Sequence, residues 1–267
     1  MPVPPLSARI RGLGVLGPGL PEWRSAAAVL TGQAPYQPAP TALPAVDALP
    51  AAERRRTGAT VRLALAVGQQ AVRDAGADAA TLATVFASSG ADGAICHEIC
   101  STLASQERQL SPTRFHNSVH NAAAGYWGIA LHATARSTAL CAFDGSFAAG
   151  LLEAVTQAAL EGAPVLLVAY ETAYPEPLNA KRPLPDAFGV ALLLDPDPRG
   201  PAHGRITLSL AQGAAQRMAE PPLEALRVSA PAARSLPLLR RLARRENGPV
   251  RLEYLGRSLQ VEVCECH

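Results

Sequence analysis

Apolar segments of strand length alternate with helical segments over residues 122–194, and this alternation constrains the fold more than any other feature. The order is helix, strand, helix, strand and strand, over 122–133, 137–143, 146–160, 165–169 and 190–194. Strands separated by a helix run parallel, because the helix crosses over one face of the sheet. The sequence therefore predicts an α/β fold with a mostly parallel mixed sheet and helices on both faces.

The N-terminal part of the chain extends this pattern. Residues 8–16 predict a short opening strand that ends in the turn cluster Gly17-Pro18-Gly19. Apolar residues on one face predict an amphipathic helix over 57–75, with Gly76 as its stop. A short apolar run over 82–87 predicts a buried strand that ends in Ser88-Ser89-Gly90. Loops at this edge of a parallel sheet commonly carry function.

Beyond Pro196 the chain becomes rich in proline and alanine. One helix is predicted over 236–245, and strands over 250–255 and 258–263 flank Gly256-Arg257, as in a two-residue hairpin. We therefore expect a main domain over 1–195. A C-terminal extension over 196–267, with one helix and a β-hairpin, is expected to pack on the same domain.

Composition places the chain among globular proteins without a strong charge bias. With 48% hydrophobic residues in 267, it is long enough to bury a substantial core. The formal net charge of +2 gives no field that favours nucleic acid or an anionic membrane. The start of the chain lacks the pattern of a signal peptide, no stretch has the length of a membrane span, and the 5 cysteines are not regularly spaced. We expect a cytoplasmic protein with reduced thiols.

The stretch from Ser137 to Ala154 carries the most information about chemistry. It is typical of a strand, a tight turn and a helix, so the turn exposes a side chain at the head of the helix. Free N–H groups and the positive end of the helix dipole there lower the pKa of a thiol or hold an anion. A nucleophile would lie at this turn, which contains Cys141, Asp144 and Ser146.

At this point the chain resembles the N-terminal half of β-ketoacyl synthases. The resemblance covers about residues 8–195 and depends on the order of its features, which are Gly14-Val-Leu-Gly17, Asp74-Ala-Gly76, Ala87-Ser-Ser-Gly90, Leu110-Ser-Pro112, Asn117 to Gly125, the turn before residue 146, Leu160-Glu-Gly162 and Arg182-Pro-Leu-Pro-Asp186. It implies a thiolase-like fold, of which this chain holds about one half. Half of a pseudo-symmetric fold is expected to leave apolar surface uncovered, and such surface usually becomes an interface.

Two departures from the family's active members bear on chemistry. Those members carry a cysteine at the head of the helix, and the alignment of helices places Asp144 at or next to that position, with Cys141 about three residues earlier. A carboxylate cannot form the thioester that condensation requires. The family's second half, which contributes two catalytic histidines, is also missing. We therefore expect no catalytic residue for condensation and no independent activity, as in the small chain-length-factor-like proteins of aryl-polyene and related pathways.

The resemblance also implies partners. A chain-length factor forms a heterodimer with a full-length β-ketoacyl synthase in fatty acid or polyketide biosynthesis, and a homodimer or contact with an acyl carrier protein is an alternative. Segment 137–143 is the candidate for pairing across the dimer. Candidate interface or tunnel residues are Phe115, His116, Tyr126, Trp127 and Phe143, although Phe115, Tyr126 and Trp127 would also suit the core. Candidate carrier-binding residues are Arg54-Arg55-Arg56, Arg240-Arg241 and Arg244-Arg245.

Alternatives stay open for several residues. Cys141 or Ser146, with His116 or His120 as base, would suit an acyltransferase or a hydrolase that acts alone, and Asp144 would also serve as a cap of the helix. A stand-alone carrier-binding module is a third possibility. We expect no cofactor and no metal, although metal ligands could be sought in His116 with His120, in Cys96-His97 with Cys100, and in Cys264, Cys266 and His267.

Overall fold

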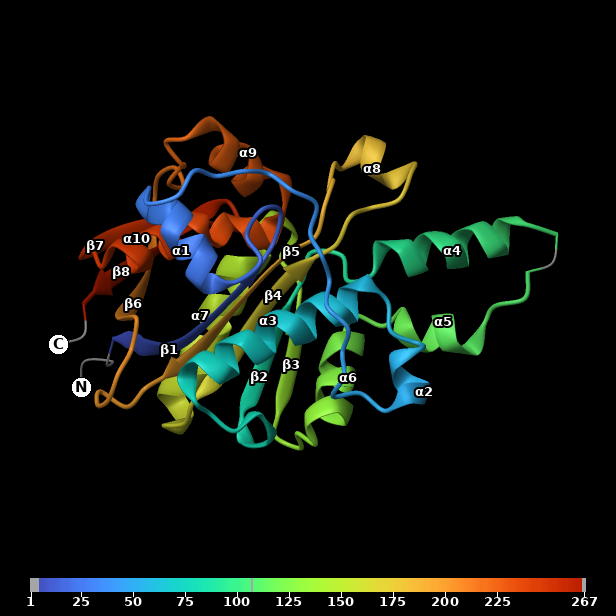
Figure 1. Cartoon of the computed structure of the whole chain (residues 1–267), viewed down its shortest axis with the longest axis horizontal. Coiled ribbons are helices and arrows are strands. Elements are labelled where there is room, and N and C mark those ends of the chain that lie inside the picture. The colour runs from blue at the N-terminus through green and yellow to red at the C-terminus, as the bar shows by residue number, and fades with distance from the viewer. Residues whose placement is uncertain (1–4, 107, 266–267) are drawn as a thin grey trace.

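Eight strands form one mixed sheet in the order β3-β2-β4-β5-β1-β6-β8-β7 (Figure 1). The computed structural model describes residues 5–106 and 108–265. The strands are, in chain order, β1 (Leu6–Leu16), β2 (Ala83–Ala87), β3 (Ser137–Leu140), β4 (Val165–Glu171), β5 (Phe188–Asp195), β6 (Gly204–Ala211), β7 (Gly248–Tyr254) and β8 (Arg257–Cys264).

Parallel pairing is confined to β3, β2 and β4. The other pairings, from β4 across to β7, are antiparallel. The mixed sheet expected of a thiolase-like half is confirmed, although its parallel part is smaller than the alternation of helices and strands suggested. The reason is that β5 lies between β4 and β1 and runs antiparallel to both, so the crossover through helix α3 (Ala59–Ala75) from β1 to β2 places no parallel neighbours side by side. Beyond β4, the chain returns without a long crossover helix and pairs antiparallel.

Helices cover both faces of the sheet, as expected. The helices and 3₁₀ turns are α1 (Trp23–Thr31), α2 (Ala51–Arg54), α3 (Ala59–Ala75), η1 (Ala79–Thr81), α4 (Gly93–Ala104), α5 (Pro112–Asn117), α6 (Ala122–Leu131), η2 (Phe143–Gly145), α7 (Ser146–Glu161), α8 (Leu178–Lys181), α9 (Pro221–Ser229), η3 (Pro231–Ser235) and α10 (Leu236–Arg244). Along β4, Leu166 and Val168 are buried in the cluster with α3 and α6, whereas Leu167 and Ala169 belong to the cluster with α7 and α10. The period of two along the strand thus separates two hydrophobic layers.

Helix α3 lies close to β1 because β1 carries glycine where the two backbones meet. A Cβ atom on Gly14 would lie 2.1 Å from the carbonyl oxygen of Val67, a distance that no side chain tolerates. The helix ends at Gly76, which adopts the left-handed conformation with φ 61° and donates to the carbonyl of Arg73. The predicted stop of this helix is confirmed.

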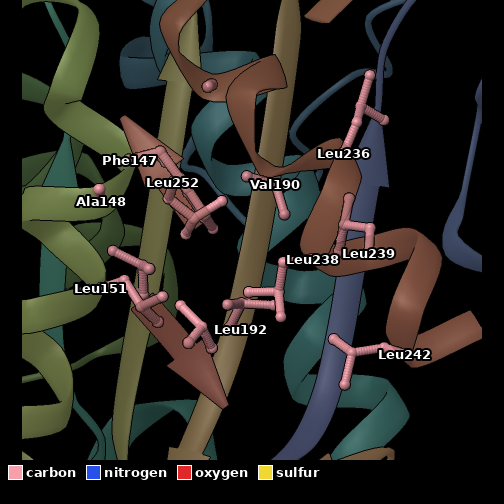
Figure 2. Packing of buried hydrophobic residues seen from close by; sticks show 14 of the residues in the cluster. Phe147, Ala148, Leu151, Val190, Leu192, Leu236, Leu238, Leu239, Leu242 and Leu252 are labelled. Carbon is pink, nitrogen blue, oxygen red and sulfur yellow. The ribbon is translucent and has the colours of Figure 1, made fainter. Parts of the chain in front are cut away.

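The C-terminal segment packs on the face of the sheet that carries α7, opposite the face that carries α3. Figure 2 shows Leu238, Leu239 and Leu242 of α10, with Leu252 of β7, against the same layer as Phe147 and Leu151 of α7. Strand β7 also contacts α7 directly, so the sheet curls around this helix. This apolar face is not left exposed, because residues of α10, η3 and the hairpin fill the space.

Local expectations for the C-terminal segment are met in part. The helix and the antiparallel hairpin are present, but the turn of the hairpin consists of Leu255 and Gly256, which both have positive φ, rather than Gly256 and Arg257. Strand β6 was not expected, although Ile206 and Leu208 alternate with polar residues. Among the described residues, no helix is both long enough and apolar enough to cross a bilayer.

Candidate functional site: the turn between β3 and α7

The carboxyl ends of the parallel strands meet at one edge of the sheet. Ser88 and Ser89 follow β2, the segment from Cys141 to Gly145 follows β3, and Glu171 is the last residue of β4. Strand β3 is shorter than predicted, because the chain leaves the sheet after Leu140 and forms η2 before α7 begins. Loops at this edge are the usual place of function in parallel sheets, so this edge is the candidate site.

Ser146 closes the turn that precedes α7. Its Oγ accepts a hydrogen bond from the backbone N–H of Ala142 at 3.0 Å and donates to the carbonyl of Phe143 at 2.7 Å. The residue is 1% exposed. A hydroxyl that is buried and engaged in two backbone hydrogen bonds holds the turn, and is poorly placed to attack a substrate.

Phe143 is the residue at the tip of the turn. Its φ of 51° lies in the left-handed region that non-glycine residues rarely adopt. Its ring is 64% exposed, and the guanidinium of Arg182 lies over it at 3.7 Å from the ring centroid. This cation–π contact ties the strained turn to the segment that precedes β5.

Asp144 is held by two arginines from distant parts of the chain. Its carboxylate accepts from Arg182 at 2.9 Å and from Arg234 of η3 at 2.9 Å. Arg234 also pairs with Glu253 of β7, so the C-terminal segment is tied to the turn. Asp144 makes no side-chain cap of α7, whose N-cap is Gly145. The prediction that Asp144 caps this helix is therefore wrong, because both carboxylate oxygens face guanidinium groups instead.

Cys141 is exposed and lies just beyond the end of β3, not inside a strand as expected. Among the described residues, no hydrogen bond joins Cys141 or Ser146 to His116 or His120. The Nε2 of His120 lies 3.0 Å from the carbonyl of Ser88, which can only accept, so this nitrogen donates. His116 lines a cavity of about 490 Å³ between α2, α5 and α6. Among the described residues, these contacts therefore pair neither Cys141 nor Ser146 with a histidine base.

Glu171 is a buried carboxyl group that the sequence analysis missed. Its Oε1 accepts from the Ser89 N–H at 2.6 Å, and its Oε2 accepts from the Ser89 hydroxyl at 2.9 Å, with the Ser88 hydroxyl at 3.5 Å. Burial raises the pKa of Glu171 to about 7, although these donors and the charge of Arg182 favour the carboxylate. The available signal was an acidic residue at the end of an otherwise apolar strand.

The predicted interface residues divide into core and surface. Trp127 is 2% exposed and packs edge-to-face on Phe86, and Tyr126 donates to Asn117, so these two rings belong to the core around α3. Phe115, on α5, and Phe143 are exposed. Exposed aromatic side chains suit an interface better than buried ones, so only Phe115 and Phe143 remain surface candidates, with His116 in the cavity beside α5.

The cysteine and histidine clusters do not come together within residues 5–106 and 108–265. Cys96 and Cys100 are exposed on α4, and Cys264 is exposed near the end of β8. No three His, Cys, Asp or Glu side chains in this described part of the chain are grouped as metal ligands. Cys266 and His267 lie outside the described residues.

A sheet of this order, with a helix rising from the carboxyl edge at a strand-to-helix turn, defines a thiolase-like ketosynthase half. The family described as "Beta-ketoacyl synthase, N-terminal domain" matches residues 23–251 of the sequence. The chain therefore belongs to the β-ketoacyl synthase N-terminal domain family. A comparison with curated proteins returned no significant match.

Solved structures with the same fold include ketosynthase and chain-length-factor assemblies. One is a chain from a ketosynthase (ApeO) in complex with its chain length factor (ApeC) from Xenorhabdus doucetiae, with TM-score 0.71, 24% identity, and coverage of 96% of this chain and 99% of that chain. Another, the ishigamide ketosynthase/chain length factor, has TM-score 0.71, 14% identity and coverage of 96% and 98%. A type II acyl-carrier protein complex with its ketosynthase, AntDE:AntF, contains a chain with TM-score 0.73, 9% identity and coverage of 97% and 99%. At such identities the likeness establishes the fold.

Proposed function

We propose that this chain is a non-condensing subunit of the chain-length-factor type, which pairs with a catalytic ketosynthase in fatty acid or polyketide biosynthesis. The observation that carries the proposal is the ion-paired Asp144 at the turn before α7, where family members that condense acyl units hold a cysteine. A carboxyl group held between two guanidinium groups offers no thiol for a thioester bond to an acyl chain. We therefore assign Asp144 a structural role in the turn rather than a catalytic one.

Strand β3 supports the proposed pairing because it forms an edge of the sheet. The Thr84 N–H donates to the carbonyl of Arg136 and the Ser88 N–H donates to the carbonyl of Leu140, so alternate residues of β3 bond to β2. The backbone groups of Ser137 and Ala139 consequently face outward. An unpaired edge of this kind is a ready template for a strand of a second subunit.

Exposed apolar side chains near this edge support the same surface. Large hydrophobic residues that remain exposed on α4, α5, the segment after α5, and α6 are Leu103, Phe115, Val119 and Ile129. Helix α6 lies beside β3, and α4 and α5 extend away from the sheet at the carboxyl end of its parallel strands (Figure 1). Clustered exposed apolar residues commonly mark a protein interface. The AntDE:AntF complex supports an acyl carrier protein as a further partner in the same assembly.

Co-expression tests the pairing. The chain would be produced together with each full-length β-ketoacyl synthase of the same genome, and the complexes separated by size-exclusion chromatography. We expect one ketosynthase to co-elute at the mass of a heterodimer, and condensation to depend on that ketosynthase's own cysteine. A chain that stays alone with every ketosynthase would contradict the proposal, and a homodimer would favour self-pairing through the same edge.

A stand-alone acyltransferase or hydrolase is the second candidate, because Cys141 is exposed. The experiment is incubation of the pure chain with an acyl thioester, followed by intact-mass analysis and peptide mapping. We expect no acyl adduct, since no base pairs with the Cys141 thiol or the Ser146 hydroxyl. An adduct at Cys141 that disappears in Cys141→Ser, with Cys96→Ser as the control, would support the enzyme instead.

A further inference from the structure

Helices α4 and α5 form an arm that extends away from the sheet (Figure 1). In α4 only Gly93 is buried, and in α5 only Asn117. The two helices are joined by an ion pair between Arg114 and Glu98 at 2.8 Å. An arm with so little buried surface cannot be oriented by its own packing, so its direction depends on the segment where it joins the sheet.

This root of the arm, residues 88–92, is a tightly packed turn. Ala91 has a φ of 51°, and its N–H donates to the Ser88 hydroxyl at 3.0 Å. A Cβ atom on Gly90 would lie 2.2 Å from the hydroxyl of Tyr174, so a larger residue there would have to displace the Tyr174 side chain. The segment that leads from α5 back to the sheet contacts the same turn through His120, which donates to the Ser88 carbonyl. Both ends of the arm therefore depend on the position of Ser88.

Glu171 fixes that turn from the neighbouring strand. Its carboxyl group receives the N–H and hydroxyl of Ser89 and faces the hydroxyl of Ser88, as described above. Glu171 is 1% exposed, so it is not a surface carboxylate. A buried carboxyl group is costly unless its hydrogen bonds are satisfied, and here all of those bonds go to the root of the arm.

We propose that Glu171 is the positioning residue of the arm, and that it presents the arm to the partner subunit in one orientation. The inference rests on the proposed function for the identity of the partner, a second chain with the thiolase-like fold. The apolar residues Leu103 and Phe115 of the arm are exposed, so a fixed orientation lowers the entropy that must be lost when they dock.

Hydrogen exchange of the free chain tests the positioning role without any partner. In Glu171→Ala we expect the amides of Ser89 to Ile95 to exchange about tenfold faster, the effect of losing a hydrogen bond to a charged group, while the amides of β4 and α7 keep their rates. Glu171→Gln should restore slow exchange, since its amide oxygen still accepts from the Ser89 N–H. The matched control is Asp195→Asn, which changes a buried carboxylate on β5 that pairs with Arg11 far from the arm. Unchanged exchange at the root, or equal acceleration in Asp195→Asn, would overturn the proposal.

A second measurement separates this role from a general loss of stability. Affinity for the co-expressed ketosynthase should fall about tenfold in Glu171→Ala and recover in Glu171→Gln, as expected when a docking element loses its preorganisation. Faster amide exchange at the root without any change in affinity would show that the arm does not dock, and would overturn the proposal. If Glu171→Ala does not fold, Ser89→Ala removes one donor at the same place, and exchange at the root must still accelerate. If the wild-type chain binds no ketosynthase, the proposed function fails while the exchange result still decides the role of Glu171.

Discussion

Asp144 lies at the turn before α7, and its side chain determines which groups this turn attracts. A turn at the head of a long helix would favour a thiolate, but a carboxylate at this place attracts guanidinium groups instead. Arg182 and Arg234 come from opposite sides of the turn and meet at Asp144. The carboxylate thus anchors the turn both to η3 and to the segment that precedes β5.

Removal of this carboxylate should destabilise the chain. Asp144→Ala leaves two arginines, both largely buried, without their shared partner, and we expect the free energy of unfolding to fall by about 2 kcal/mol. This value is below that of fully buried pairs, because the side chain of Asp144 is 32% exposed. Urea denaturation measures the change. Asp47→Ala, which removes an exposed carboxylate paired with Arg54, is the control and should change nothing measurable.

The raised pKa of Glu171 makes stability depend on pH. The ordinary pKa of 4.5 applies in the unfolded chain, and burial raises the pKa to about 7 in the folded chain, so the folded state binds the proton more tightly. The contribution of this group is therefore fully present below pH 4.5 and is lost as the pH rises through about 7. The loss is on the order of 3 kcal/mol.

Chemical denaturation at a series of pH values measures this dependence. We expect the wild-type chain to lose stability across that interval, and Glu171→Gln to show a flatter profile, because the amide does not titrate. Arg182 is the nearby cation that opposes the shift, so Arg182→Ala should enlarge the total loss and extend it to higher pH. Identical profiles for the wild-type chain and Glu171→Gln would contradict the assignment.

At the residue scale, the sequence located the turn but not its contacts. The position of Asp144 follows from the spacing of the helix and the strand. Its partners Arg182 and Arg234 could not be predicted, since they depend on how the C-terminal segment folds back over α7. Trp127 was grouped with interface residues because aromatic residues are rare in this chain. Its burial against Phe86 and Gly68 depends on a packing that no local pattern reveals.

At the scale of elements, periodicity predicted what lies in the interior. Helices α3 and α7 and strands β4 and β5 have strong patterns, and all four are present within a few residues of their expected bounds. Helix α4 was missed because it is exposed on nearly all sides, so it has no single apolar face to detect. Strand β6 was missed because proline-rich sequence surrounds it.

A proline substitution tests the edge role of β3. Ala139→Pro removes an N–H that faces away from β2, so the free chain should keep its melting temperature to within a few degrees while its association with a ketosynthase weakens at least about tenfold. Thr138→Pro is the matched control, because it removes a hydrogen bond to β2 and should destabilise the free chain. Calorimetry measures the first effect and sedimentation the second. Undiminished association of Ala139→Pro would exclude pairing through β3.

At the scale of the whole molecule, the N-terminal and C-terminal segments share one core. The layer that contains α7 includes residues of β1, β4, β5, α10 and β7 together. The C-terminal segment thus fills this layer together with α7 and the sheet. Because neither segment can bury its apolar residues alone, we expect the chain to unfold as a single cooperative unit.

Leu239→Ala tests this cooperativity. The side chain is fully buried between α10 and the sheet, so its truncation should cost about 3 kcal/mol. In a chain that also carries Trp23→Phe, circular dichroism and the fluorescence of Trp127 should report the same shifted transition, although Trp127 lies in the opposite layer. Leu210→Ala, which truncates an exposed leucine on β6, serves as the control and should have little effect. Two separate transitions would show that the segments fold independently.

The open edge at β3 has a consequence for how a cell must produce this chain. Ser137 to Leu140 contains no charge and no proline, the devices by which natural sheets prevent edge-to-edge aggregation. A copy made in excess of its partner therefore presents a strand to which another copy can add. We expect inclusion bodies when the chain is expressed alone at high level, and their disappearance when the two subunits are translated in equal amounts. With the proposed pairing, balanced dosage of the two genes would be required, because the edge at β3 is open until the partner covers it.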